Sequence, residues 1–138
     1  MTGSCLCAAV TYTVAGLDGP IGHCHCQTCR KAHSAAFATV ARVRADEFRW
    51  TGGQDKLRQF TSSPGKHRVF CGECGTHIVA LLDGADQMVL RVASLDDDPG
   101  EQPIAHIWTS HDRPWLGWKH LPEHQEWSPP PTPRGGRP

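Results

Sequence analysis

The sequence predicts a mainly β domain. Most of its apolar residues fall in short segments that are rich in β-branched and aromatic side chains. Fourteen glycines and 11 prolines divide these segments, so turns are frequent. With 38% hydrophobic residues in a chain of 138, one modest core is expected rather than two large ones. Many short strands and little helix favour an all-β arrangement.

The positions of these glycines and prolines set the bounds of the expected elements. Strands are predicted at Leu6–Val14, Ala35–Val43, Phe48–Gly52, Leu57–Ser63, Lys66–Phe70, Thr76–Leu82, Gln87–Leu95 and Ile104–Ser110. The segment 21–26 should be extended, and Gln27–His33 should form a single helical turn. The sequence Asp83-Gly84-Ala85-Asp86 is a turn between two strands, and residues 96–103 form a loop.

Residues 2–122 are expected to form one domain, followed by a tail at 123–138. The tail is rich in Pro, Gly and Arg and cannot bury a core, so it is expected to be disordered. The formal net charge is zero at pH 7, which argues against a nucleic-acid-binding protein. No apolar run reaches the roughly 20 residues of a membrane helix, and no secretory signal is evident. A cytoplasmic protein is therefore expected, either monomer or homodimer.

The seven cysteines occur in three short clusters, here called hooks: Cys5 and Cys7, then Cys24, Cys26 and Cys29, then Cys71 and Cys74. The first and last of these hooks together predict one zinc site. Cys71 and Cys74 belong to the sequence Cys-Gly-Glu-Cys-Gly, a tight turn whose glycines allow positive φ and close approach. Cys5 and Cys7 would share one face of an extended strand, so both sulfurs could reach the same ion. Four thiolates saturate a tetrahedral zinc, and such a site is structural.

The middle hook, Cys24, Cys26 and Cys29, predicts a second zinc with one free position. Three ligands from one short loop cover one face of a tetrahedron, and catalytic zinc sites keep their fourth corner for water or substrate. Two other interpretations are open. The hook could contain a redox pair, or its zinc could be structural with a histidine as the fourth ligand.

Several other side chains are candidates for work at the open site. Arg30, Lys31 and Arg68 are cations that could offset thiolate charge and bind substrate, although surface roles are common for such residues. His33 lies four residues after Cys29, so a helical turn would bring it to the same face as a proton acceptor. His23 and His25 alternate with the cysteines and should point away from the ion.

The motifs together resemble one family. Gly3–Cys7 (GSCLC), Cys24–His33 (CHCQTCRKAH), Phe70–Thr76 (FCGECGT), Ser94–Gly100 (SLDDDPG) and His106–Ser110 (HIWTS) occur in the order found in glutathione-dependent formaldehyde-activating enzymes and centromere protein V. The resemblance implies an Mss4-like (β-tent) fold of antiparallel sheets. It also implies a structural zinc at Cys5, Cys7, Cys71 and Cys74 and a catalytic zinc at Cys24, Cys26 and Cys29.

The same resemblance implies a carbon–sulfur lyase type of activity. The zinc-bound thiol, possibly glutathione, would add to or leave an aldehyde such as formaldehyde. Two alternatives belong to other classes. The chain could be a zinc-stabilised binding module in which both metals are structural, or a zinc hydrolase, which an all-thiolate triple makes less attractive.

Overall fold

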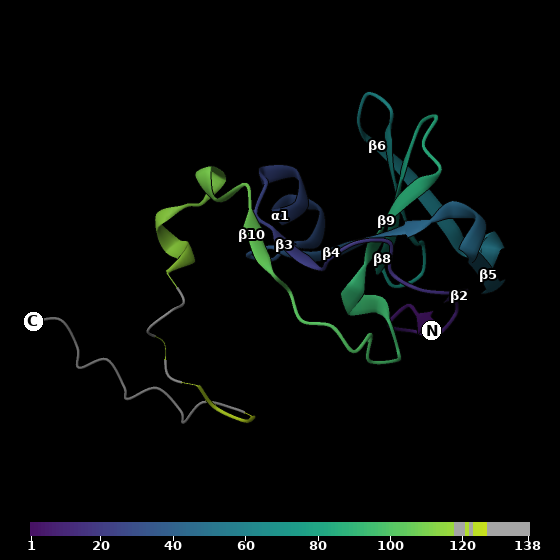
Figure 1. The fold of residues 1–138 in the computed structure, drawn as a ribbon, viewed down its shortest axis with the longest axis horizontal. Helices are drawn as coiled ribbons and strands as arrows, with labels where there is room; N and C mark the ends of the chain where they lie inside the picture. Colours follow the sequence, from purple (N-terminus) through teal and green to yellow (C-terminus); the bar gives the residue numbers. More distant parts are fainter. Residues whose placement is uncertain (118–120, 122, 127–138) are drawn as a thin grey trace, which may run out of the picture.

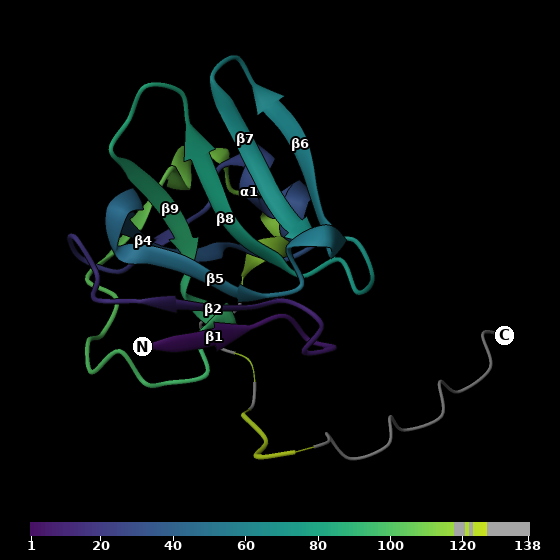
Figure 2. The same cartoon turned by 90° about the vertical axis from the view of Figure 1, so that its right-hand side faces the viewer.

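A computed structural model describes residues 1–117, 121 and 123–126, and it contains two β-sheets (Figure 1). The smaller sheet has the order β1-β2-β5, and the larger one has the order β10-β3-β4-β9-β8-β7-β6. The strands of the smaller sheet are β1 (Thr2–Ser4), β2 (Thr11–Val14) and β5 (Phe48–Gly52). In Figure 2 these three strands form a layer below the ends of β7, β8 and β9.

The larger sheet contributes most of the backbone pairing. Its strands are β3 (Gly22–Cys24), β4 (Ala38–Arg44), β6 (Leu57–Ser63), β7 (Lys66–Cys71), β8 (His77–Leu82), β9 (Gln87–Arg91) and β10 (Ala105–Ile107). All neighbouring strands pair antiparallel except β10, which pairs parallel to β3. The antiparallel, mainly β prediction is therefore confirmed, with one parallel pair added at the edge.

Helical structure is short. The α-helix α1 spans Gln27–His33, where a helical turn was predicted. Single 3₁₀ turns occupy η1 (Ala45–Glu47), η2 (Gln54–Lys56), η3 (Val92–Ser94), η4 (Thr109–His111) and η5 (Pro114–Leu116). No helix in the described part of the chain is both long and apolar enough to cross a bilayer.

The main core lies between the two sheets. From the small sheet, the rings of Tyr12 and Phe48 stack with their centroids 5.0 Å apart. From the large sheet, Val79 and Leu90 are fully buried. Cys5 and Cys71 belong to this same core. A second, smaller cluster contains Cys24, Cys29 and Ala38 and lies apart from it. The two cysteine groups are therefore packed into separate apolar surroundings.

Most strand predictions are confirmed, and the first one is wrong in an informative way. Strands β5 and β6 have the predicted bounds, and β7, β8 and β9 lie within a residue or two of theirs, apart from the end of β9, which becomes a 3₁₀ turn. The predicted strand Leu6–Val14 is a strand only from Thr11. The predicted strand Ile104–Ser110 is a strand only over Ala105–Ile107, and a 3₁₀ turn follows at Thr109–His111. The predicted domain boundary and tail, 123–138, fall mainly on residues 127–138, which lie outside the described residues.

Candidate metal centres

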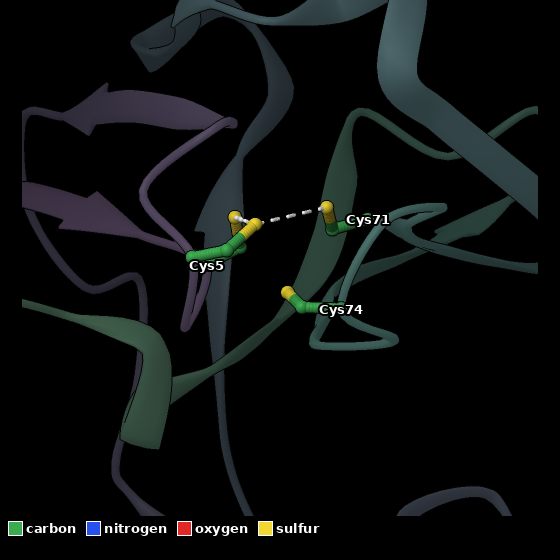
Figure 3. A group of neighbouring side chains, drawn as sticks. Cys5, Cys71 and Cys74 are labelled. Carbon is green, nitrogen blue, oxygen red and sulfur yellow. Dashed lines mark hydrogen bonds between the residues drawn. The ribbon is translucent and has the colours of Figure 1, made fainter.

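Four cysteine side chains converge where the first loop meets the turn after β7. The sulfur atoms of Cys5, Cys7, Cys71 and Cys74 all lie within 4.8 Å of one another. Cys7 Sγ is 3.5 Å from Cys5 Sγ and 3.9 Å from Cys71 Sγ. Sulfurs about 2.3 Å from a tetrahedral zinc are about 3.8 Å apart, so the group fits that ion. Figure 3 shows Cys5, Cys71 and Cys74 directing their sulfurs toward a common centre.

The loop that carries Cys5 and Cys7 is a turn and not the predicted strand. Ala8 has a positive φ of 57°, and its N–H donates to the Cys5 carbonyl at 2.8 Å. Cys5 N–H in turn donates to the Val10 carbonyl at 3.0 Å. In a strand, residues two apart are separated by about 6.6 Å along the chain. The turn instead brings the two sulfurs to the separation that one ion requires.

The turn after β7 forms as its glycine predicts. Gly75 has a φ of 77°, and its N–H donates to the Cys71 carbonyl at 2.9 Å. The Thr76 hydroxyl lies 3.3 Å from Cys74 Sγ and accepts a hydrogen bond from Leu6 N–H at 3.1 Å. The hydrogen bond from Thr76 lowers the pKa of Cys74 to about 5. The same hydroxyl therefore joins the two hooks and favours a thiolate.

The other three cysteines form a second group around the start of α1. Cys24 ends β3, Cys26 caps the helix, and Cys29 lies in its first turn. Their sulfurs lie within 4.8 Å of one another, and Cys26 Sγ accepts a hydrogen bond from Cys29 N–H at 3.3 Å. Within residues 1–117, 121 and 123–126, this group contains three ligand side chains and no fourth. A zinc held here would have one coordination position for an external ligand.

The second group is poised to carry negative charge. The pKa of Cys29 is lowered to about 4, first by the hydrogen bond from Cys24 and also by Arg68. The pKa of Cys24 is raised, because Cys24 donates to Cys29 and is buried. These shifts favour a thiolate at Cys29, and metal binding would favour deprotonation of the other two cysteines.

Two buried arginines stand beside this group. Arg68 is 2% exposed and Arg91 is 4% exposed, although arginine is almost never fully buried without a partner. Arg68 Nη2 lies 3.8 Å from Cys29 Sγ. The charges of Arg91 and Cys29 also interact: Arg91 lowers the pKa of Cys29. Thiolate charge explains why two guanidinium groups are tolerated in the interior.

Sequence reasoning included Arg68 but missed Arg91. The available signal was an arginine inside the apolar run Met88–Val92, where every neighbour predicts a buried strand. A charge at such a position requires a counter-charge in the fold. Here the counter-charge comes from a cysteine loop more than 60 residues earlier in the sequence, which no local pattern reveals.

A cavity of about 470 Å³ opens beside the three cysteines. Its lining includes Cys24, Cys29 and Arg91, together with the apolar side chains of Ile107 and Trp108. Trp108 adopts a φ of 63°, a conformation that is uncommon for a bulky residue. A cavity of this size accommodates a small organic substrate next to the ion that the cysteines could hold.

The wall that bears Trp108 is fixed by residues next to the cysteines. His25 N–H donates to the Ile107 carbonyl at 2.9 Å, and the His25 ring lies between Asp112 Oδ1 at 2.7 Å and His106 Nδ1 at 2.8 Å. The side chain of His25 is therefore directed away from the cysteine group, as alternation predicts.

Arg30 holds the same wall. It donates to the carbonyl groups of His25 at 3.1 Å and His111 at 2.7 Å, and its guanidinium lies 6.0 Å from the Trp115 ring centre. The structure therefore places Arg30 against the 105–116 segment, whereas sequence reasoning offered it as a substrate ligand.

The remaining candidates surround other hollows. His33 follows Cys29 on α1, but it lines a hollow of about 360 Å³ with His77 and Arg91, away from Cys24. The His33 and His77 rings are 4.8 Å apart. Lys31 lines a third hollow of about 390 Å³, which also includes Arg68. The helix thus carries its basic residues to different sides of the three-cysteine group.

The fold and the two cysteine groups define a small β protein built around candidate metal centres, and comparisons give its family. The family model for the glutathione-dependent formaldehyde-activating enzyme matches residues 1–111. The chain therefore belongs to this family.

Curated relatives carry names of the same kind. An Aspergillus flavus protein assigned as a glutathione-dependent formaldehyde-activating enzyme is 32% identical over 82 residues, which is 57% of this chain and 42% of that protein. A Podospora anserina protein with the same assignment is 35% identical over 85 residues, 59% of this chain and 39% of that protein. An uncharacterized lyase of Schizosaccharomyces pombe is 28% identical over 74 residues, 54% of this chain and 52% of that protein. The matches span about half or less of each relative.

A solved structure shares the fold. A crystal structure of a Rhodobacter sphaeroides protein aligns with a TM-score of 0.63 and 25% identity, covering 77% of this chain and 99% of that chain. The similarity extends over nearly all of the Rhodobacter chain, so the mainly β arrangement is common to both proteins.

Proposed function

We propose that the chain is a zinc-dependent enzyme of the carbon–sulfur lyase type that joins a small thiol to an aldehyde, or reverses that reaction. Membership of the family and the lyase name of one relative support this class of activity. The single observation that carries the proposal is the contrast in ligand number: one group of four cysteines and one group of three beside a cavity. Glutathione and formaldehyde are the proposed pair, by relation to the named relatives.

Cys5, Cys7, Cys71 and Cys74 would hold a structural zinc, and Cys24, Cys26 and Cys29 a catalytic one. The donor set fits, because soft thiolates select zinc over harder cations. When bound, the catalytic zinc would lower the pKa of an external thiol and favour its thiolate at neutral pH.

The residues of the chain then have separate tasks. Arg68 and Arg91 offset the negative charge that gathers when thiolates share a buried site. The thiol sulfur attacks the carbonyl carbon of the aldehyde, a C–S bond forms, and the former carbonyl oxygen takes up a proton. We propose that the proton lost by the thiol passes to the aldehyde oxygen through solvent. His33 was expected to accept this proton, but burial lowers its pKa to about 3, so its imidazole is neutral and too weakly basic for that role, and it lines the second hollow.

The other basic candidates act at a greater distance in this proposal. Lys31 is exposed and would attract an anionic thiol toward the helix. Arg30 would act as a positioning residue, because it fixes the wall that carries Trp108.

The experiment is a direct assay of adduct formation. Zinc-loaded protein is mixed with glutathione and ¹³C-formaldehyde, and exchange between the free aldehyde and its thiol adduct is followed by NMR. Wild-type protein should accelerate exchange above the uncatalysed rate, and Cys24→Ser should not. Equal rates for wild type and Cys24→Ser would overturn the proposed function.

A further inference from the structure

Arg91 carries a feature that charge balance with the cysteines does not explain. Its Nε and Nη2 atoms are both buried and have no hydrogen-bond partner among the described residues. Burial lowers the pKa of Arg91 to about 10, so the group stays protonated at neutral pH. A buried cation with free N–H groups is costly unless a further partner satisfies them.

The two free nitrogens lie on one edge of the guanidinium. Nε–H and one Nη2–H point in parallel, and this pair is the fork that accepts both oxygens of a carboxylate. Arg68 is different. Its Nη2 faces Cys29 Sγ, and its free atoms, Nε and Nη1, do not form such an edge. Both arginines are buried, but of the two only Arg91 has a complete edge of the guanidinium without a hydrogen-bond partner.

The surroundings of Arg91 provide both space and further donors. Arg91 lines the cavity with Cys24 and Cys29, and it also lines the second hollow of about 360 Å³. In that hollow His33 Nε2 and His77 Nδ1 are buried without partners. Burial lowers the pKa of both histidines, so each is neutral and can donate one N–H. No acidic residue of the described chain lines the second hollow.

The backbone holds Arg91 in place. The residue ends β9 in register with Val40, and its carbonyl accepts from Ser94 Oγ at 2.8 Å. The Ser94 hydroxyl is in turn 2.8 Å from Tyr12 OH in the main core. A fixed backbone limits how far the guanidinium can move, which is the preorganisation that a binding site needs.

We propose that Arg91 is the receptor for a carboxylate anion, which it binds through its Nε–Nη2 edge with help from His33 and His77. The carboxylate has two possible sources. It can be a separate small carboxylate in the second hollow, or it can belong to the thiol substrate and reach Arg91 from the cysteine side. The second source rests on the proposed function, and the first does not.

The test measures binding alone, without aldehyde, on zinc-loaded protein by calorimetry. Acetate reports on a carboxylate that carries no thiol. 3-Mercaptopropionate and 3-mercaptopropionamide share a thiol and a similar shape, but only the first has a carboxylate. A separate site predicts that acetate binds and that Arg91→Lys weakens it about tenfold or more. A carboxylate on the substrate predicts that acetate binding is undetectable while mercaptopropionate binds at least about tenfold more tightly than the amide.

Arg91→Lys keeps the charge and removes the fork. It should therefore weaken acetate binding in the first case and remove the preference for mercaptopropionate over the amide in the second. Arg68→Lys is the matched control: it can weaken both thiols, but it should preserve their ratio. If Arg91→Lys does not fold, His77→Phe should reduce the same preference. The assignment is wrong if wild type binds neither acetate nor one thiol over the other, or if the preference survives in Arg91→Lys. Failure of the proposed function has a different signature, namely thiol binding that Cys24→Ser leaves unchanged.

Discussion

The two cysteine groups use the same ligand and differ in what surrounds it. The group of Cys5, Cys7, Cys71 and Cys74 joins the main core, and its supporting contacts are a hydroxyl and backbone N–H groups. The group of Cys24, Cys26 and Cys29 lies in a separate small cluster with Arg68 at its side and a cavity next to it. Four sulfurs complete a tetrahedron, whereas three leave a position for a substrate.

The difference suggests that one cysteine group serves the stability of the fold and the other serves the proposed chemistry. The first group ties the N-terminal loop to the end of β7, so its metal would connect segments more than 60 residues apart. The second group comes from a single loop and helix start, so its metal would close only a short stretch of chain. Long-range closure affects folding, whereas the local group can be altered without loss of the core.

The largest effect is expected from Cys71→Ser. Cys71 is fully buried, and a structural zinc contributes binding free energy of about 10–16 kcal/mol, comparable with the total stability of a domain. We expect loss of folded protein, measured as soluble yield and by circular dichroism. A Cys71→Ser protein with the thermal midpoint of wild type would contradict a structural role.

Cys24→Ser is expected to separate the two groups. The variant should fold, retain one of the two zinc equivalents and lose thiol-dependent adduct formation, because only the local group is damaged. Metal content by mass spectrometry and a thermal melt are the measurements. Unfolding as severe as that of Cys71→Ser would remove the distinction between the groups.

A smaller effect is expected from Arg68→Gln. Loss of the guanidinium beside Cys29 should weaken zinc at the three-cysteine group by about 10- to 100-fold, the range for partners of metal ligands. Zinc at the four-cysteine group should be unaffected. Chelator competition measures both affinities. Arg58→Gln, an exposed arginine on β6 beside the turn after Cys71, is the control and should change neither.

The smallest effect concerns pH. His33 has a folded-state pKa of about 3, lowered mainly by burial from its ordinary value of 6.5. The unfolded chain therefore binds a proton first as the pH falls. The part of the unfolding free energy that depends on neutral His33 is fully present above pH 6.5. It is lost as the pH falls below 6.5, by on the order of 1 kcal/mol at pH 5.

His33→Gln should remove this part of the acid sensitivity, measured as the difference in unfolding free energy from wild type between pH 7 and pH 5. The exposed His124 supplies a control, because His124→Gln should leave the slope unchanged. An identical slope in wild type and His33→Gln would show that His33 is not held neutral in the folded protein.

Sequence patterns predicted most of the strands and the grouping of the cysteines into a set of four and a set of three, because these depend on local spacing. They failed where the answer depends on backbone strain or distant packing. Ala8 has a positive φ, which an alanine in the sequence does not predict, and this conformation turns Cys7 back toward Cys5. Arg91 reaches the cysteines only because β9 pairs with β4 and ends beside them. Arg30 follows a ligand directly in sequence, yet the helix turns it toward the 105–116 segment.

The unequal number of protein sulfurs at the two groups is tested most directly by zinc-edge X-ray absorption on protein loaded with two equivalents of zinc. We predict an average between three and four sulfur neighbours per zinc, because one group offers four cysteines and the other three. The average should rise to four when glutathione is added. An average of four before any thiol is present, or no change on addition, would contradict it.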